Sequence, residues 1–164
     1  MRVKDVALIG ILSATLTAGK LALSYLPNIE IVTLLLIVYT VIFGLKRSIM
    51  ASVIFSTTEV LIYGFSTWLL GYYIIWSLLI IITAFIQKTV KSEYGYAALA
   101  AIFGLFYGLF FAVVESFFYG TAYGISYWIR GIPFDIIHCA SNFILVILLY
   151  KPLYNVLTKY IQNN

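Results

Sequence analysis

The chain has 164 residues, of which 63% are hydrophobic and only 10% are charged, and its mean hydropathy is +1.05. A water-soluble domain of this length could not hide so much apolar surface, so the composition excludes a soluble globular protein. The net charge of +4 does not indicate nucleic-acid binding, because the basic residues stand singly or in pairs beside apolar runs, as they do in membrane proteins.

The apolar runs are continuous, whereas the strands of a membrane β-barrel would alternate apolar and polar residues. A helix needs about 20 residues to cross a hydrocarbon layer of roughly 30 Å, so six spans joined by short turns would use nearly the whole chain. We therefore expect an all-α membrane protein, with residues 1–164 forming one compact bundle of six transmembrane helices. The first apolar run follows basic residues, as in a signal peptide. Because a long membrane sequence follows it, we expect this run to remain in the protein as the first transmembrane helix.

The first three expected spans are separated by short polar turns. They are Asp5–Tyr25, Ile29–Leu45 and Ser48–Phe65. The first span ends at the turn Leu26-Pro27-Asn28, because the residue before a proline disfavours helix. The second ends at Lys46-Arg47, and the third is followed by a connection from Gly64 to Gly71 that fits either a loop or a partly inserted segment.

The last three expected spans are Tyr72–Gln87, Tyr96–Tyr119 and Pro133–Tyr150. A polar stretch from Lys88 to Gly95 separates the first two of them. Between Gly120 and Gly131, the segment TAYGISYWIR is too polar for a lipid-facing span and too apolar for a solvated loop, and we expect it to cap a site. Proline is favourable in the first turn of a helix, so the last span should begin at Pro133.

The distribution of basic residues predicts the orientation in the membrane. Eight of them fall at the N terminus, between the second and third spans, between the fourth and fifth spans, or in the C-terminal tail: Arg2, Lys4, Lys46, Arg47, Lys88, Lys91, Lys151 and Lys159. Six spans place these four regions on one side, and only Arg130 falls in a loop on the other side. Because cytoplasmic loops are enriched in Lys and Arg, both termini are expected in the cytoplasm.

Strongly polar side chains are few within the expected spans. They are Lys20, Glu59, Glu115, Asp135, His138 and Asn142. Each charged one costs at least about 2.5–3.5 kcal/mol near the bilayer centre, so its presence needs a reason. Four of them lie on four different helices at one depth, roughly 7–11 Å below the outer helix ends. These four are Lys20, Glu59, Glu115 and His138.

Two patterns organise these polar residues. Asp135, His138 and Asn142 follow i, i+3, i+7 spacing, which stacks them on one face of the last span. The pattern Glu-x-x-x-Tyr-Gly occurs at 59–64 and again at 115–120, with Ile-Phe-Gly upstream of both copies. This is compatible with a repeated helix hairpin, although the upstream spacing differs between the copies.

We interpret this layer as an outward-facing polar pocket walled by aromatic side chains, two or three of which stack on a flat ligand. The candidate binding residues are Glu59, Glu115, His138, Asn142, Lys20, Tyr63, Tyr119 and Trp128. The alternative is structural. In that case Lys20 pairs with a glutamate, while His138 and Asn142 satisfy neighbouring helices.

Small residues recur every fourth position on the first span, at Gly10, Ala14, Ala18 and Ala22. Such a stripe lets another helix approach closely, either from this protein or from a partner subunit.

Familiar catalytic motifs are missing, including the Walker A loop, His-Glu-x-x-His and Gly-x-Ser-x-Gly. With one histidine and the single Cys139, we expect neither enzyme activity, nor a metal site, nor a cofactor.

Over nearly its whole length the chain resembles the substrate-binding S components of energy-coupling factor (ECF) vitamin transporters. The size, the six spans and the cytoplasmic termini are similar. The particular stretches are the stripe at Gly10, Ala14 and Ala18, the segment Leu-Pro-Asn-Ile-Glu at 26–30, and Gly-Ile-Pro-Phe-Asp at 131–135 with Asn142 and Lys151-Pro-Leu-Tyr after it.

The resemblance implies a multi-pass protein of a prokaryotic plasma membrane that captures a vitamin or vitamin precursor from outside. A separate transmembrane coupling subunit would dock on the stripe of the first helix, and two ABC ATPase subunits would supply the energy. The loaded subunit would then topple in the membrane to release its cargo. Two carboxylates and several aromatic rings favour a pyridoxine-like or aminopyrimidine ligand, with cobalamin and thiamine as alternatives. A self-sufficient small permease or channel is the other interpretation.

Overall fold

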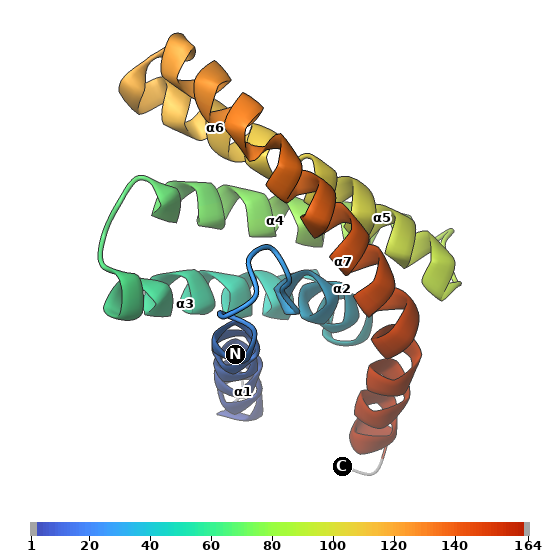
Figure 1. Cartoon of the computed structure of the whole chain (residues 1–164). Helices are drawn as coiled ribbons and strands as arrows, with labels where there is room; N and C mark the ends of the chain where they lie inside the picture. The colour runs from blue at the N-terminus through green and yellow to red at the C-terminus, as the bar shows by residue number, and fades with distance from the viewer. Residues whose placement is uncertain (1–2, 163–164) are drawn as a thin grey trace.

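In the computed structural model, which describes residues 3–162, every regular element is an α-helix and no strand occurs in that range (Figure 1). The helices are α1 (Val3–Ala22), α2 (Val32–Phe43), α3 (Leu45–Tyr63), α4 (Trp68–Ile86), α5 (Glu93–Leu105), α6 (Tyr107–Tyr119) and α7 (Thr121–Gln162). The expected all-α class is confirmed. Arg2 lies outside the described residues.

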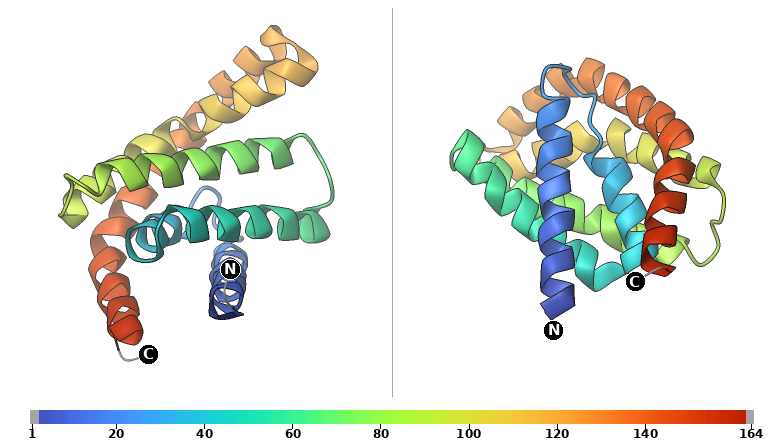
Figure 2. Two further views of the ribbon diagram at one scale, coloured as in Figure 1. Left: turned by 180° about the vertical axis from the view of Figure 1, so that it is seen from behind. Right: turned by 90° about the horizontal axis from the view of Figure 1, so that it is seen from below.

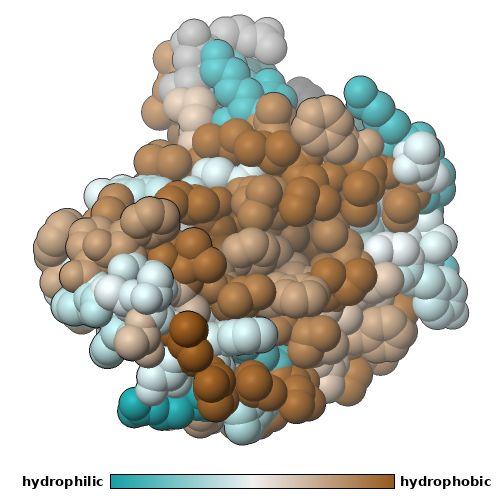
Figure 3. Space-filling model, turned by 90° about the horizontal axis from the view of Figure 1, so that it is seen from above, coloured by the Kyte–Doolittle hydropathy of each residue, from teal (hydrophilic) through white to brown (hydrophobic). Residues whose placement is uncertain are grey.

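Within the described residues, four helical runs are long and apolar enough to cross a membrane: α1, α4, the α5–α6 run and α7. The surface agrees with this composition, since large apolar side chains such as Leu61, Phe65 and Phe117 are more than four-fifths exposed. Figure 3 shows one broad hydrophobic face whose hydrophilic patches lie near its rim. These features fit a membrane protein.

Two helices fall short of that length or hydropathy for different reasons. The short helix α2 occupies the centre, packed against α1, α3, α4, α5 and α7, and ten of its 12 residues are buried. The longer α3 is less apolar because Ser48, Ser52, Ser56 and Glu59 form much of its buried face. Small serine side chains let α1 and α4 approach α3 closely.

The helix hairpins alternate between two ends of the molecule. The α3–α4 and α6–α7 connections lie at one end, and the α4–α5 connection lies at the opposite end (Figure 1). In the right-hand view of Figure 2, α1 begins and α7 ends on the same side, while the α1–α2 loop lies on the other. This alternation brings the α1–α2, α3–α4 and α6–α7 connections toward a common end.

The two copies of the Glu-x-x-x-Tyr-Gly pattern form the same local structure. Gly64 and Gly120 end α3 and α6 with φ values of 79° and 88°, and each donates its N–H to the carbonyl four residues earlier at 2.9 Å. Glycine adopts this positive φ without the steric cost that a Cβ would bring. The pattern therefore marks two helix ends that each carry a buried glutamate one turn inside, Glu59 and Glu115.

The segment between Gly120 and Gly131 is not a separate connection, because α7 is one helix of 42 residues that begins at Thr121, although Tyr123, Tyr127 and Arg130 of this segment do line a cavity. Its start packs closely against α6: a Cβ on Gly124 would lie 1.8 Å from Ser116 Oγ and 2.6 Å from the Ala112 carbonyl oxygen. Pro133 also lies inside this helix rather than in its first turn. A helical proline loses one backbone hydrogen bond and clashes with the preceding turn, a cost that packing against neighbouring helices offsets.

Three other boundaries differ from the expectation. The span 96–119 is divided at Phe106, which separates α5 from α6. The connection before α4 is shorter than expected, because the helix begins at Trp68. The prolines of α7 include Pro152, so the helix continues past the expected end at Tyr150.

We predict that Gly124→Ala destabilises the protein by about 1–3 kcal/mol, because the added methyl group has no room between α6 and α7. Gly131→Ala is the matched control on the same helix, since its Cβ would meet nothing within 4 Å. Thermal unfolding in detergent measures both variants. Equal unfolding temperatures would contradict the close packing of α6 against α7.

Candidate functional site

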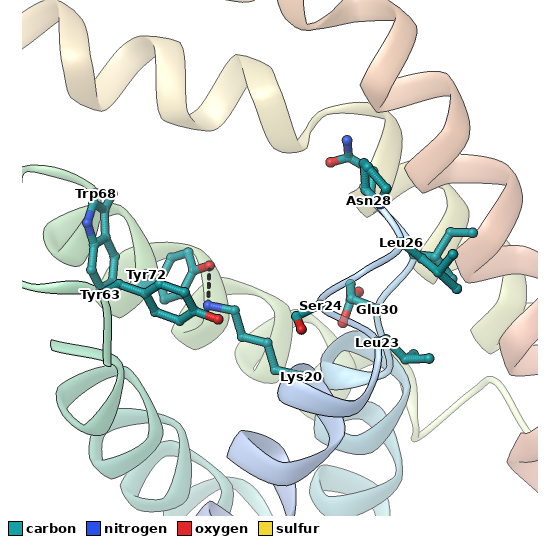
Figure 4. Close-up of a pocket in the computed structure, with 11 residues that line it drawn as sticks. Lys20, Leu23, Ser24, Leu26, Asn28, Glu30, Tyr63, Trp68 and Tyr72 are labelled. Carbon is teal, nitrogen blue, oxygen red and sulfur yellow. Dashed lines mark hydrogen bonds between the residues drawn. The ribbon is translucent and has the colours of Figure 1, made fainter. Parts of the chain in front are cut away.

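Two cavities adjoin the α1–α2 loop, residues 23–31, and Asn28 lines both of them. The first, which we call the lysine cavity, has a volume of about 410 Å³ and lies among the end of α1, the loop, Tyr63 and the start of α4 (Figure 4). The second, the tyrosine cavity, has a volume of about 400 Å³ and lies between α6 and α7. Both volumes fall within the range of small-molecule sites.

A buried ion pair between helices α1 and α3 adjoins the lysine cavity, which Lys20 lines. The ammonium of Lys20 contacts Oε2 of Glu59, whose side chain is fully buried. The same ammonium donates a hydrogen bond to the Tyr72 hydroxyl at 3.1 Å, drawn as the dashed line in Figure 4. It also lies 4.6 Å from the ring centroid of Tyr63 and 4.8 Å from that of Tyr72. A carboxylate and two aromatic rings therefore surround one cation.

Only one of the two carboxylate oxygens of Glu59 has a hydrogen-bonding partner. Its Oε1 atom is buried and has no hydrogen-bond partner in the described part of the chain. A buried carboxylate oxygen without a donor is costly, and native structures leave few such groups. One acceptor beside the ion pair, behind the cavity wall that Lys20 forms, is therefore unused.

Two side chains of helix α7 make hydrogen bonds with the α1–α2 loop. His138 Nε2 lies 3.1 Å from Glu30 Oε1, and Ser141 donates a hydrogen bond to the Asn28 carbonyl at 2.9 Å. The other oxygen of Glu30 accepts the backbone N–H of Thr33 at 2.9 Å, in the first turn of α2. Glu30 therefore joins the loop to α7 and satisfies a free donor at the start of α2.

In the tyrosine cavity, Asp135 from α7 interacts with the start of α6. Its Oδ1 accepts the backbone N–H of Gly108 at 2.9 Å, which satisfies a free donor in the first turn of that helix. Its Oδ2 is buried without a hydrogen-bond partner among the described residues. The cavity wall also includes Tyr107, Tyr127 and Arg130, and the Tyr107 ring lies 4.8 Å from the ring of His138.

An aromatic layer lies behind both cavities. Tyr72 of the lysine cavity and Tyr107 of the tyrosine cavity both pack against Phe111, at centroid distances of 5.8 and 5.1 Å. Both also pack against Trp76 at 5.7 Å. The two cavities consequently share a continuous aromatic wall built by α4 and the α5–α6 region.

The structure brings together only some of the candidate binding residues. Lys20 and Tyr63 line the lysine cavity, Glu59 pairs with Lys20 behind its wall, and His138 packs against the tyrosine cavity wall. The remaining four, which line neither cavity, are Glu115, Asn142, Tyr119 and Trp128.

Three of these four have partners within the chain. Glu115 accepts a hydrogen bond from Thr67 at 2.7 Å, which ties α6 to the α3–α4 connection. Asn142 donates to the Ala100 carbonyl at 3.4 Å, between α7 and α5. Tyr119 is more than half exposed and packs against Tyr123 with their ring centroids 5.0 Å apart. All of these contacts join parts of the chain to one another.

The small-residue stripe of α1 faces outward. Gly10, Ala14 and Ala18 are exposed, and a Cβ on Gly10 would meet nothing within 4 Å. The opposite face of α1 is buried through four residues at helical spacing, Ile9, Leu12, Ser13 and Leu16. Within this chain, therefore, no other described helix covers the stripe.

Sequence reasoning omitted four residues that the structure places around the cavities: Glu30, Tyr72, Tyr107 and Asp135. A carboxylate three residues after Pro27, at the start of a strongly apolar helix, was the available signal for Glu30. Tyr72 and Tyr107 had no distinguishing signal among 14 tyrosines. Asp135 stands among the polar residues of the expected last span, outside the expected set of binding residues.

The two cavities are lined by groups that donate and accept hydrogen bonds and by aromatic rings. Among the described residues, no three His, Cys, Asp or Glu side chains are grouped closely enough to hold a metal ion. The cavities offer carboxylate acceptors, tyrosine hydroxyls and aromatic faces, which suit hydrogen bonding and stacking of a small flat molecule. Comparison of this chain with protein-family models, with characterised proteins and with solved structures finds no match.

Proposed function

We propose that this chain is a substrate-binding S component of an ECF-type importer, which captures a small molecule outside the cell and passes it to partner subunits. One observation supports this most strongly: buried carboxylates, a lysine and a shared aromatic wall surround two cavities at one end of an otherwise apolar helical protein. Polar groups at such a depth are costly unless they bind something or pair with one another.

The proposed topology has six spans, counting α5 and α6 as one, with both termini in the cytoplasm of a prokaryotic cell. The basic residues support this orientation, because Lys46 and Arg47 stand between α2 and α3, and Lys88 and Lys91 stand between α4 and α5. Arg130 lies in the first half of α7, near the end that carries the cavities. The cavities then open toward the outside.

The outward face of α1 is the proposed docking surface for the transmembrane coupling subunit. Its exposed small residues would let a partner helix approach closely. Two ATPase subunits would bind to that coupling subunit, because the chain itself has no Walker A loop. Release of cargo by toppling of the loaded subunit belongs to the same proposal.

The proposed cargo is a vitamin or vitamin precursor with one flat ring, either pyridoxine-like or an aminopyrimidine. Cavities of about 400 Å³ stand at the lower end of the range for ligand sites, which favours a single ring over a corrinoid such as cobalamin. Thiamine, which contains an aminopyrimidine, remains the alternative cargo.

Reconstitution tests the proposal against a self-sufficient permease. The purified chain in liposomes should bind its ligand, one molecule per chain, yet mediate no flux, because the energy comes from partner subunits. Flux without ATP or partners would contradict the proposal and favour the permease.

A matched pair of measurements on one variant tests the docking surface. Ala14→Leu/Ala18→Leu should retain ligand binding in the purified chain, because both positions lie far from the buried face of α1. It should abolish uptake by cells that contain the partner subunits. Loss of binding in the purified variant would show that the stripe serves the fold of this chain.

The two glutamates of the repeated pattern should differ in their effect on binding. Glu59→Gln should weaken ligand affinity by about 1.5–3 kcal/mol, because a hydrogen bond to a charged group is lost in the lysine cavity. Glu115→Gln is the matched control, since its carboxylate bonds Thr67 rather than the cavity residue Lys20. Calorimetry with the ligand that copurifies with the chain measures both, and an equal effect would contradict the assignment of the lysine cavity.

A further inference from the structure

The Lys20 ammonium occupies a position built like a binding site for a ligand's cation. Glu59 supplies a buried carboxylate, Tyr72 supplies a hydroxyl at 3.1 Å, and Tyr63 and Tyr72 present ring centroids within 5 Å. Carboxylates and aromatic faces are the groups with which proteins bind the ammonium groups of ligands. Lys20 approaches from the rim, at the last turn of α1, and Figure 4 shows its side chain pointing toward the two tyrosines.

We propose that Lys20 is an internal substitute for the ligand: it fills the cation position of the lysine cavity when the cavity is empty and is displaced when a cationic ligand binds. This inference rests on the proposed function, because it assigns the ligand's charged group to that same site.

The two partners of the ion pair differ in freedom of movement. The Glu59 side chain is fully buried in α3, whereas the Lys20 side chain is 23% exposed at the edge of a cavity of about 410 Å³. A lysine carries its charge on a flexible four-carbon stem and can swing toward water. Lys20 can therefore leave the site, while Glu59 remains in it.

Charge balance makes exchange of one cation for another favourable. A carboxylate buried among apolar helices needs a neighbouring cation to remain charged. Departure of Lys20 alone would leave Glu59 uncompensated, but arrival of a ligand cation keeps the net charge of the cavity constant. The lysine then excludes neutral and anionic molecules from the empty site without preventing entry of a cation.

The unpartnered oxygen of Glu59 indicates the class of cation. Lys20 contacts Oε2 alone, and the buried Oε1 has no donor among the described residues. A flat cation with two N–H groups in a fork, such as an amidinium or an aminopyrimidinium, would donate to both oxygens. Its ring would stack on Tyr63 or Tyr72. Between the two leading ligand classes, this geometry favours the aminopyrimidine.

Chemical rescue of a truncated lysine tests the inference without the natural ligand. Lys20→Ala removes the side chain beyond Cβ and leaves a vacancy of the size of propylammonium beside Glu59. Propylammonium should raise the unfolding temperature of Lys20→Ala by about 3 °C or more and leave the wild type unchanged. Propanol, which lacks the charge, should have no effect. Lys91→Ala, which truncates an exposed lysine, is the matched control and should not respond to propylammonium.

Benzamidinium tests the class of ligand and the competition with Lys20. It should bind Lys20→Ala more tightly than propylammonium does, because its fork reaches both oxygens of Glu59. Its dissociation constant should be at least about ten-fold lower for Lys20→Ala than for the wild type, since the internal ammonium no longer competes. Equal affinity for the two proteins, or stabilisation of the wild type alone by benzoate, would overturn the inference.

A charge-free double variant separates binding from general stabilisation. Lys20→Met/Glu59→Gln removes both charges, should fold, and should respond to neither cation. If it responds as Lys20→Ala does, or if Lys20→Ala is neither stabilised nor recovered from membranes by propylammonium, the inference is overturned. None of these measurements needs the natural ligand or the partner subunits, so failure of the importer proposal alone would leave their outcome unchanged.

Discussion

A carboxylate buried among apolar helices must be compensated, and this constraint organises one end of the molecule. Glu59 is fully buried in α3, so it requires a cation, and Lys20 supplies one from α1 while Tyr72 of α4 accepts a hydrogen bond from the same ammonium. Three helices are thereby tied at one point. Removing Lys20 would leave the Glu59 charge buried and uncompensated, which costs more than the pair contributes to stability.

The long helix α7 connects two further segments of the chain, the α1–α2 loop and the start of α6. Through His138 it contacts Glu30 of the α1–α2 loop, and through Asp135 it satisfies the start of α6. Because these two residues stand one turn apart on α7, the loop and the break between α5 and α6 are positioned by a single rigid element. The aromatic layer of Trp76 and Phe111 then supports both cavities from behind.

The helical class and most helix ends could be predicted from the sequence, because hydropathy and helix-ending glycines are local signals. The pairing of Lys20 with a glutamate was one of its two interpretations, and the structure selects Glu59 as the partner. The continuity of α7 was not predictable from local signals, since Gly124 and Pro133 read as helix breakers when the contact with α6 is unknown. Glu115 illustrates the same limit: its partner Thr67 is distant in sequence and lies in a connection whose conformation depends on packing.

The molecule that accompanies the purified protein tests most directly whether the chain binds one small flat cation beside Glu59. Native mass spectrometry from detergent should show a single adduct per chain, and fragmentation should identify a flat compound with basic ring nitrogens. The adduct should disappear in Glu59→Gln and persist in Glu115→Gln. An adduct that is anionic, or one that survives loss of the Glu59 charge, would contradict the binding of a cation beside Glu59.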